Sequence, residues 1–174
     1  MASLVALSCL FETLEAYAAP LKLRVTSSGF KNGKMMPAKY GCNGAGVSPP
    51  LAWSKVPAGT QSIAILMVDP KGGPFHHWGT YNIPPNRRSI RAKFKNTETN
   101  ETVNDWGFLG YGEPCPPGAT HPYIFYVVAL DTTVMPNTEG DYLASSFYDD
   151  VFTGALSSHV LARGSIKGMY YSEG

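Results

Sequence analysis

The chain has 174 residues, of which 44% are hydrophobic and 16% are charged, and its formal net charge is +1. This length and composition are those of one globular domain with a real core, so intrinsic disorder is excluded. A net charge this close to zero gives no broad positive field, and nucleic acid is therefore not expected as a partner. The basic segment 87–95 is interpreted as a solvated loop and strand edge, with a surface for an anionic partner as the alternative.

The N-terminus resembles an export leader. Residues 4–11 are largely apolar, and Ala16-Tyr17-Ala18 fits the small-x-small pattern that precedes a cleavage site. Two glutamates interrupt the segment and no Lys or Arg precedes it, so a frayed helix of a cytoplasmic protein is the alternative. We expect a signal peptide over residues 1–18, a single domain over residues 19–174, and a periplasmic or secreted protein. No other stretch approaches the roughly 20 apolar residues that span a bilayer, so stable membrane insertion is not expected.

Apolar periodicity predicts a domain made mainly of strands. The continuous apolar run 62–68 is typical of a strand buried on both faces, and Trp53 is expected in the core. In chain order, strands are predicted over residues 21–25, 35–40, 48–53, 62–68, 77–83, 123–131, 160–166 and 168–171. This number of strands, with connections rich in Gly and Pro, favours a sandwich over alternating strands and helices.

Helix is scarce in the predicted structure. Apolar residues recur at roughly helical spacing between residues 141 and 158, which is the best candidate for a helix. Asp141 is placed to cap its start, and Gly154 weakens its middle.

The cysteines bear on the compartment. Cys9 would be removed with the leader, which leaves Cys42 and Cys115 as an even pair. Such a pair often forms a disulfide in an oxidising compartment and stays reduced in the cytosol. Two isolated cysteines do not make a tetrahedral zinc site. A Cys42–Cys115 bridge is therefore expected if the protein is exported.

Four side chains with hydrogen-bonding groups lie at the ends of predicted strands, beside stiff turns of Pro and Gly. Asp69 follows the run 62–68, and His77 begins the next strand. His121 and Tyr123 are two residues apart, so they share one face of an extended segment. If the first two strands pair antiparallel, and the His121 strand runs alongside the His77 strand in the same direction, all four side chains rim one opening.

Such an opening would suit a phosphate or a carboxylate. Two imidazoles and a phenol are donors, and the backbone N–H groups of Gly112 and Gly118 would add to them. Asp69 would orient a histidine, favour its cationic form, or accept from a ligand hydroxyl or ammonium group. Each residue also has a structural alternative: a histidine at a strand start is more often structural than ligand-binding, and Tyr123 could be core.

Catalysis is not expected, and no cofactor is implied. A zinc site of two histidines and one aspartate lacks the H-E-x-x-H spacing. There is no G-x-S-x-G motif, and Cys115 stands between prolines without an obvious base.

Several segments of the chain occur together in one protein family. They are Ser48-Pro-Pro-Leu-Ala-Trp53, the Asp69-Pro segment that ends in His76-His77-Trp78, Gly112–Gly118 with His121-x-Tyr123, Tyr123–Asp131 and Ser158–Arg163. With these segments the chain resembles the phosphatidylethanolamine-binding proteins (PEBP, or Raf-kinase-inhibitor-like proteins) of the bacterial and archaeal branch, over nearly all of its length after the leader.

The resemblance implies a mainly β fold, a Greek-key antiparallel β-sandwich with a few short helices and a small anion-binding pocket at one end. The pocket residues that it implies are Asp69, His77, Pro117, His121 and Tyr123. The chain departs from the family pattern at Lys71, where a second acid is usual, and at Pro122.

Lys71 makes the rim more positive, which would favour phosphate over amine recognition. We therefore expect a non-enzymatic binding protein for a small phosphorylated or anionic ligand. The alternative is a protein-interaction module that inhibits a serine protease or a kinase through a surface loop, because family membership alone does not decide function.

Overall fold

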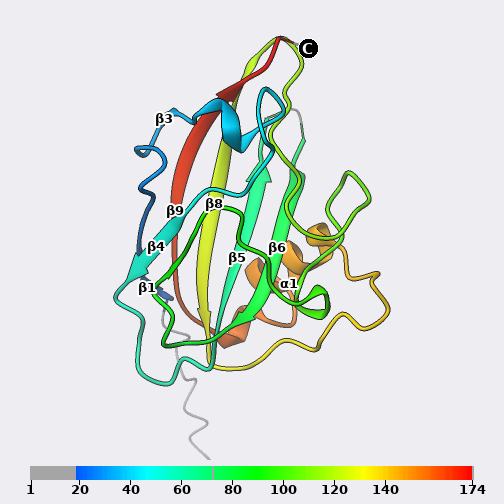
Figure 1. Ribbon diagram of the computed structural model, residues 1–174. Coiled ribbons are helices and arrows are strands. Elements are labelled where there is room, and N and C mark those ends of the chain that lie inside the picture. Colours follow the sequence, from blue (N-terminus) through cyan, green and yellow to red (C-terminus); the bar gives the residue numbers. More distant parts are fainter. Residues whose placement is uncertain (1–18, 72, 174) are drawn as a thin grey trace, which may run out of the picture.

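The computed structural model describes residues 19–71 and 73–173, and strands dominate its regular structure (Figure 1). The expected signal peptide and Cys9 lie outside the described residues. The strands are β1 (Leu21–Lys22), β2 (Arg24–Thr26), β3 (Lys34–Met35), β4 (Leu51–Ser54), β5 (Ser62–Asp69), β6 (Phe75–Ile83), β7 (Ser89–Ile90), β8 (Thr120–Leu130) and β9 (Val160–Tyr171). The helices are α1 (Ala144–Phe152) and the single-turn helices η1 (Ala38–Tyr40), η2 (Glu98–Asn100) and η3 (Ser157–His159).

The strands form two sheets. The larger sheet has the order β1-β9-β8-β5-β6, with β3 also paired to β9, and the smaller sheet has the order β2-β4-β7. The long strands of the larger sheet, β5, β6, β8 and β9, pair antiparallel. Its short strands β1 and β3 pair with β9 in parallel. The long connection after β6 returns the chain beside β5. The prediction of a mainly β sandwich with few helices is therefore confirmed.

Strand β5 of the larger sheet is buried on both faces. On one face, Ile63, Ile65 and Met67 of β5 belong to a core cluster that includes Trp53 of the smaller sheet. On the other face, residues of β5 pack in a second cluster with Phe147 of α1, and Figure 1 shows α1 behind the sheet and β4 in front of it. Side chains of a strand alternate between faces, so a strand covered on both sides must be apolar throughout. This explains the continuous run 62–68.

Two predicted strands near the N-terminus differ from the structure. The segment 21–25 is divided between the sheets: β1 joins the larger sheet, β2 joins the smaller one, and buried Leu23 lies at the change. The segment 35–40 is mostly not a strand, because β3 ends at Met35 and η1 follows. Short polar segments rich in Gly and Pro give little periodicity, so their pairing depends on tertiary contacts.

The predicted helix 141–158 is shorter in the structure. Helix α1 spans nine residues, its N-cap is Leu143, and no side chain caps it, so the assignment of Asp141 as the cap is wrong. The Asp141 backbone N–H instead donates to Oδ1 of Asn137 at 3.0 Å. Gly154 lies beyond the helix end. Within the described part of the chain, no helix combines the length and the apolar character that crossing a membrane requires.

Candidate functional site

Strands β5 and β8 bring three of the four predicted side chains together at one end of the larger sheet. Their register pairs Met67 with Phe125 and Val68 with Ile124. Continued by one residue, this register sets Asp69 opposite Tyr123 and diagonal to His121. Directly opposite and diagonal side chains are close enough to interact. The sheet pairing therefore places these three groups on the same face.

His77 joins this group because β6 is irregular at that point. The β5–β6 register shifts between Met67, which pairs with Trp78, and Val68, which pairs with His76. His77 is the extra residue, as in a β-bulge, and bulges re-aim side chains. The His77 ring lies 5.1 Å from the Tyr123 ring, edge to face, whereas His76 packs against Tyr148 of α1 on the other face.

Asp69, His77, His121 and Tyr123 thus form one group, which we call the Asp69 cluster. The expected adjacency of the His121 and His77 strands is wrong, because β5 lies between β6 and β8. The direction is right: both strands are antiparallel to β5 and so run the same way. The side chains still meet, since all of them come from the same end of the sheet.

A close contact between an aspartate and a histidine lies at the centre of the Asp69 cluster. Oδ2 of Asp69 lies 2.6 Å from Nδ1 of His121, and Oδ1 accepts the Lys71 backbone N–H at 2.9 Å. Asp69 is buried, whereas the His121 side chain is 18% exposed. The ammonium group of Lys71 donates to the Thr120 carbonyl at 3.1 Å, which holds it beside the start of β8. His121 and Lys71 therefore form the accessible edge of the cluster.

His77 is buried and neutral. Burial lowers its pKa below the ordinary value, against the smaller opposing effects of the Gly112 carbonyl and nearby carboxylates. Nδ1 of His77 lies 3.0 Å from the Gly112 carbonyl oxygen, which can only accept. Nδ1 therefore carries the proton, and Nε2 is an acceptor. The N–H of His77 is thus used within the chain, so the expectation that both imidazoles donate to a ligand is wrong for His77.

Tyr123 keeps its phenolic proton. Burial raises the pKa of Tyr123 above its ordinary value. The negative charge of Asp69 and the hydrogen bond between Tyr123 and Asp69 raise this pKa further. A backbone hydrogen bond from Cys115 opposes this shift. Tyr123 therefore remains a donor next to Asp69, with its ring in the core.

The backbone donors expected from two glycines are engaged elsewhere. The Gly112 N–H donates to the His77 carbonyl at 2.8 Å, and the Gly118 N–H donates to the Ser172 carbonyl at 3.1 Å. Pro117 is exposed and pairs as an isolated bridge with Ser172. These glycines fix the segment beside the cluster. The Lys71 ammonium group, expected only as a positive charge, is a hydrogen-bond donor at this edge.

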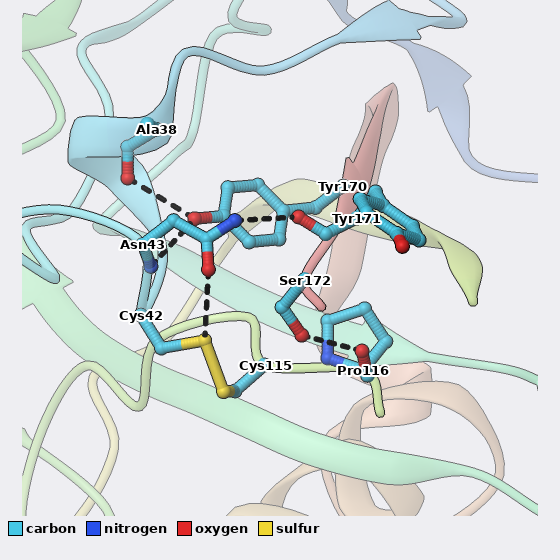
Figure 2. The surroundings of a disulfide bond; sticks show 8 residues. All are labelled: Ala38, Cys42, Asn43, Cys115, Pro116, Tyr170, Tyr171 and Ser172. Atoms are coloured by element: carbon cyan, nitrogen blue, oxygen red, sulfur yellow. Dashed lines mark hydrogen bonds between the residues drawn. A yellow bond between two sulfur atoms is a disulfide. The ribbon is translucent and has the colours of Figure 1, made fainter. Parts of the chain in front are cut away.

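A disulfide ties the 112–118 segment to the turn after η1. Cys42 and Cys115 are bonded, with their Cα atoms 5.3 Å apart (Figure 2), a separation typical of disulfides. The Ser172 hydroxyl, directly after β9, donates to the Pro116 carbonyl at 2.5 Å. This bond holds the same segment against the end of β9. The bridge that the sequence predicts for an exported protein is present.

The turn that carries Cys42 is also fixed to β9. Nδ2 of Asn43 donates to the Tyr171 carbonyl at 3.0 Å. The Tyr170 hydroxyl accepts the Asn43 backbone N–H at 3.0 Å and donates to the Ala38 carbonyl at 3.1 Å (Figure 2). The disulfide thus joins two segments that are each anchored on the C-terminal strand.

An aromatic wall that the sequence pattern does not predict flanks the Asp69 cluster. The Phe75 ring lies 4.8 Å from the His77 ring and 5.0 Å from the Trp106 ring. Trp106 and Phe108 are 52% and 45% exposed. Oδ1 of Asn104 accepts the Trp106 N–H at 3.0 Å and fixes this turn. A run of exposed apolar residues within a polar turn is the signal that could have found it.

Four cavities lined by described residues lie elsewhere on the molecule, and their walls include none of the four cluster side chains. The Asp69 cluster is a closely packed group, reached through His121 and Lys71.

Comparison with known proteins agrees with the fold. Residues 26–171 match the family model described as phosphatidylethanolamine-binding protein. A UPF0098 protein of Chlamydia muridarum is 34% identical over 155 residues, which cover 85% of this chain and 98% of the relative. The crystal structure of a PEBP homolog, CT736 of Chlamydia trachomatis, superposes with a TM-score of 0.75 at 30% identity and covers 87% of this chain and 98% of that one. E. coli YbcL, described as a new member of the mammalian PEBP family, gives a TM-score of 0.73 at 28% identity, over 87% of this chain and 99% of that one. On this agreement of sequence and fold, the chain belongs to the phosphatidylethanolamine-binding protein family.

Proposed function

We propose that this protein is a non-enzymatic binding protein whose Asp69 cluster holds a small ligand by a phosphate or another anionic group. The observation that carries the proposal is the pairing of partly exposed His121 with buried Asp69 at 2.6 Å. Since Nδ1 of His121 faces the carboxylate, Nε2 is the nitrogen left for a ligand. In the protonated imidazole, Nε2 donates a charge-assisted hydrogen bond to an anion. The Lys71 ammonium group adds a second positive charge at the same edge.

The two histidines divide the recognition between them. His121 and Lys71 suit the negatively charged oxygens of the ligand, whereas Nε2 of neutral His77 accepts a hydrogen bond. A phosphate monoester that carries one proton offers both a charged oxygen and an O–H group. The cluster therefore fits a singly protonated phosphate better than an anion that can only accept hydrogen bonds.

The same geometry supports binding over catalysis. Cys115 is held in a disulfide and cannot act as a nucleophile. Both oxygens of Asp69 accept hydrogen bonds, one from His121 and one from a backbone N–H. Nδ1 of His77 is committed to a carbonyl. These groups are arranged to hold a charge in place.

Calorimetry with inorganic phosphate and with O-phosphoethanolamine tests the proposal. We expect His121→Ala to weaken binding of both by roughly tenfold or more, because a charge-assisted hydrogen bond is lost. His159→Ala is the matched control: His159 also pairs with an aspartate, Asp131, at 2.7 Å, but both side chains are exposed and Asp131 follows the far end of β8. Equal affinities in the wild type and both variants would show that His121 binds no anion.

Export from the cytoplasm is the second part of the proposal. The Cys42–Cys115 disulfide supports it, because such bonds persist in oxidising compartments. Fractionation of the source cells, with mass spectrometry of the mature N-terminus, tests it. A chain that begins at Ala19 in an extracytoplasmic fraction is expected, whereas an intact Met1 in the cytoplasmic fraction would contradict it.

A second candidate function rests on the exposed run Trp106, Phe108 and Leu109 beside the cluster. Exposed apolar patches often mark protein contacts, and the candidate function is inhibition of a serine protease or a kinase through this loop. An inhibition panel with Trp106→Ser and His121→Ala separates the two functions. Inhibition that is lost in the first variant and kept in the second supports the loop, whereas inhibition unchanged in both, or absent from the wild type, rejects it.

A further inference from the structure

A cavity of about 390 Å³ lies on the molecule apart from the Asp69 cluster. Its volume is in the range of small-molecule sites. It is lined by Gly46, Val47, Ser48, Lys93, Phe94, Lys95, Asn96, Glu98, Glu101, Leu109, Gly110 and Tyr111. It shares no residue with the cluster, and we call it the Glu101 cavity.

Glu101 gives this cavity a buried carboxylate. The residue is 7% exposed, and its backbone pairs with Thr80 as an isolated bridge beside β6. Oε2 accepts the indole N–H of Trp78 at 2.8 Å, and Oε1 accepts the Asn96 backbone N–H at 3.1 Å. Both donors are neutral. Each carboxylate oxygen has a further lone pair, so Glu101 can accept from a ligand as well.

A cation is missing from the surroundings of this carboxylate. Among residues 19–71 and 73–173, the ion pairs within 4.0 Å are all between a histidine and an aspartate, and none involves Glu101. Burial raises the pKa of Glu101 to about 7, against the smaller opposing effects of hydrogen bonds from Trp78, Asn96 and the Thr80 side chain. A buried carboxylate without a cation carries a large desolvation cost, which a cationic ligand would offset.

The remaining walls describe the rest of the ligand. Phe94 and Tyr111 both pack edge-on against Trp78, with ring centroids 6.5 and 5.5 Å from it. Together with Leu109 they give the cavity apolar walls. Lys93, Lys95 and Glu98 are exposed residues of the same lining, so the outer part carries a net positive charge. A purely cationic ligand would be disfavoured there, and an acidic group would be favoured.

We propose that the Glu101 cavity binds a small molecule with an ammonium group at one end, an apolar middle and an acidic group at the other end. The ammonium group pairs with Glu101, the apolar middle lies against Phe94, Leu109 and Tyr111, and the acidic group meets Lys93 and Lys95. This site operates independently of anion binding at the Asp69 cluster.

Calorimetry at pH 8 with three related probes tests each part of this assignment. We expect 4-(aminomethyl)benzoate to bind best, benzylamine to bind less well, and 4-methylbenzoate, which has no ammonium group, to bind worst. Glu101→Gln should weaken the two ammonium probes by about tenfold while leaving 4-methylbenzoate unweakened. Exchanging both lysines for alanine should weaken 4-(aminomethyl)benzoate and spare benzylamine.

A second variant guards against a folding defect at Glu101. Leu109→Trp enlarges a side chain of the cavity lining, keeps Glu101 unchanged in sequence, and should weaken binding of all three probes. Met135→Trp is its matched control, because Met135 is 83% exposed and lines a different cavity. His121→Ala should leave the affinities for the probes unchanged. No saturable binding to the wild type, equal affinities in the Glu101→Gln or Leu109→Trp variants, or loss of binding in His121→Ala would each overturn the assignment.

Discussion

Asp69 and Glu101 are buried to nearly the same degree, at 5% and 7% exposure, yet their surroundings differ in kind. Asp69 faces an imidazole at 2.6 Å and a backbone N–H at 2.9 Å. Glu101 faces the neutral donors of Trp78 and Asn96, and burial raises its pKa to about 7. Depth of burial therefore does not decide what a carboxylate can do. At Asp69 the chain itself supplies an imidazole partner; at Glu101 it supplies only neutral donors.

The two regions also differ in how their walls are held. The 112–118 segment beside the Asp69 cluster is cross-linked to the turn after η1 and hydrogen-bonded to the end of β9. The described walls of the Glu101 cavity contain no cysteine. Removing the disulfide should therefore affect binding at the Asp69 cluster more than binding at the Glu101 cavity.

Removing the disulfide is expected to have the largest effect on stability. The two cysteines are 73 residues apart in sequence, and a loop of that size contributes roughly 3–5 kcal/mol by restricting the unfolded chain. The double variant Cys42→Ser with Cys115→Ser should lose about that much free energy of unfolding in urea, and its phosphate affinity should fall. Binding of 4-(aminomethyl)benzoate should change less. A reducing agent should reproduce these effects in the wild type and have none on the variant; an unchanged unfolding midpoint would contradict this account.

Glu101 should make the protein less stable as the pH rises. Its folded pKa is about 7 and its ordinary value is 4.5, so between these values the folded state binds a proton that the unfolded state does not. Stability is then lost as the pH increases through that window, by about 1.4 kcal/mol per pH unit and about 3 kcal/mol in all.

The measurement is urea unfolding of the wild type and Glu101→Gln at several pH values from 4.5 to 8. The difference between the two proteins isolates Glu101 from the histidines, which titrate in the same range. The wild type should lose stability relative to the variant as the pH rises. If the free energy of unfolding changed with pH equally in the two proteins, the inference of a buried Glu101 carboxylate that lacks a cation would be wrong.

His77 should make the protein less stable as the pH falls, the opposite of the effect of Glu101. Burial lowers its pKa below 6.5, so in acid the unfolded state binds a proton that the folded state resists. The stability that neutral His77 provides is present above pH 6.5 and is lost as the pH falls below it. His77→Phe should reduce this acid sensitivity, at a cost of about 1 kcal/mol at pH 8 because the Gly112 carbonyl loses its donor. His159→Phe is the control at an exposed histidine; identical acid limbs in His77→Phe and the wild type would refute the assignment.

The long strands and the meeting of Asp69 with His121 could be predicted because both follow from periodicity. Apolar runs mark strands buried on two faces, and strand ends at one edge of a sheet bring side chains together. The adjacency of strands could not be predicted in the same way, since it depends on where the long connection after β6 returns the chain. The division of segment 21–25 at Leu23 could not be predicted either. Only tertiary pairing places β1 in one sheet and β2 in the other.

The chemistry of individual groups was harder to predict than their positions. That His77 is an acceptor depends on a bulge and on the Gly112 carbonyl, neither of which leaves a sequence pattern. The glycine N–H groups are engaged in backbone pairing that only the folded chain reveals. The Glu101 cavity escaped notice because a single glutamate in a polar segment has no periodicity, and its burial comes from residues distant in sequence.

Lys71 should have the smallest effect on stability and a selective effect on binding. It is exposed, and its ammonium group makes one hydrogen bond, to the Thr120 carbonyl. Lys71→Met should therefore change the free energy of unfolding by less than about 0.5 kcal/mol. Phosphate affinity should fall a few-fold and lose part of its dependence on ionic strength, whereas Lys71→Arg should keep both. Unchanged phosphate affinity in Lys71→Met would leave His121 as the sole cation of the cluster, and the contrast with Glu101 would then rest on that one imidazole.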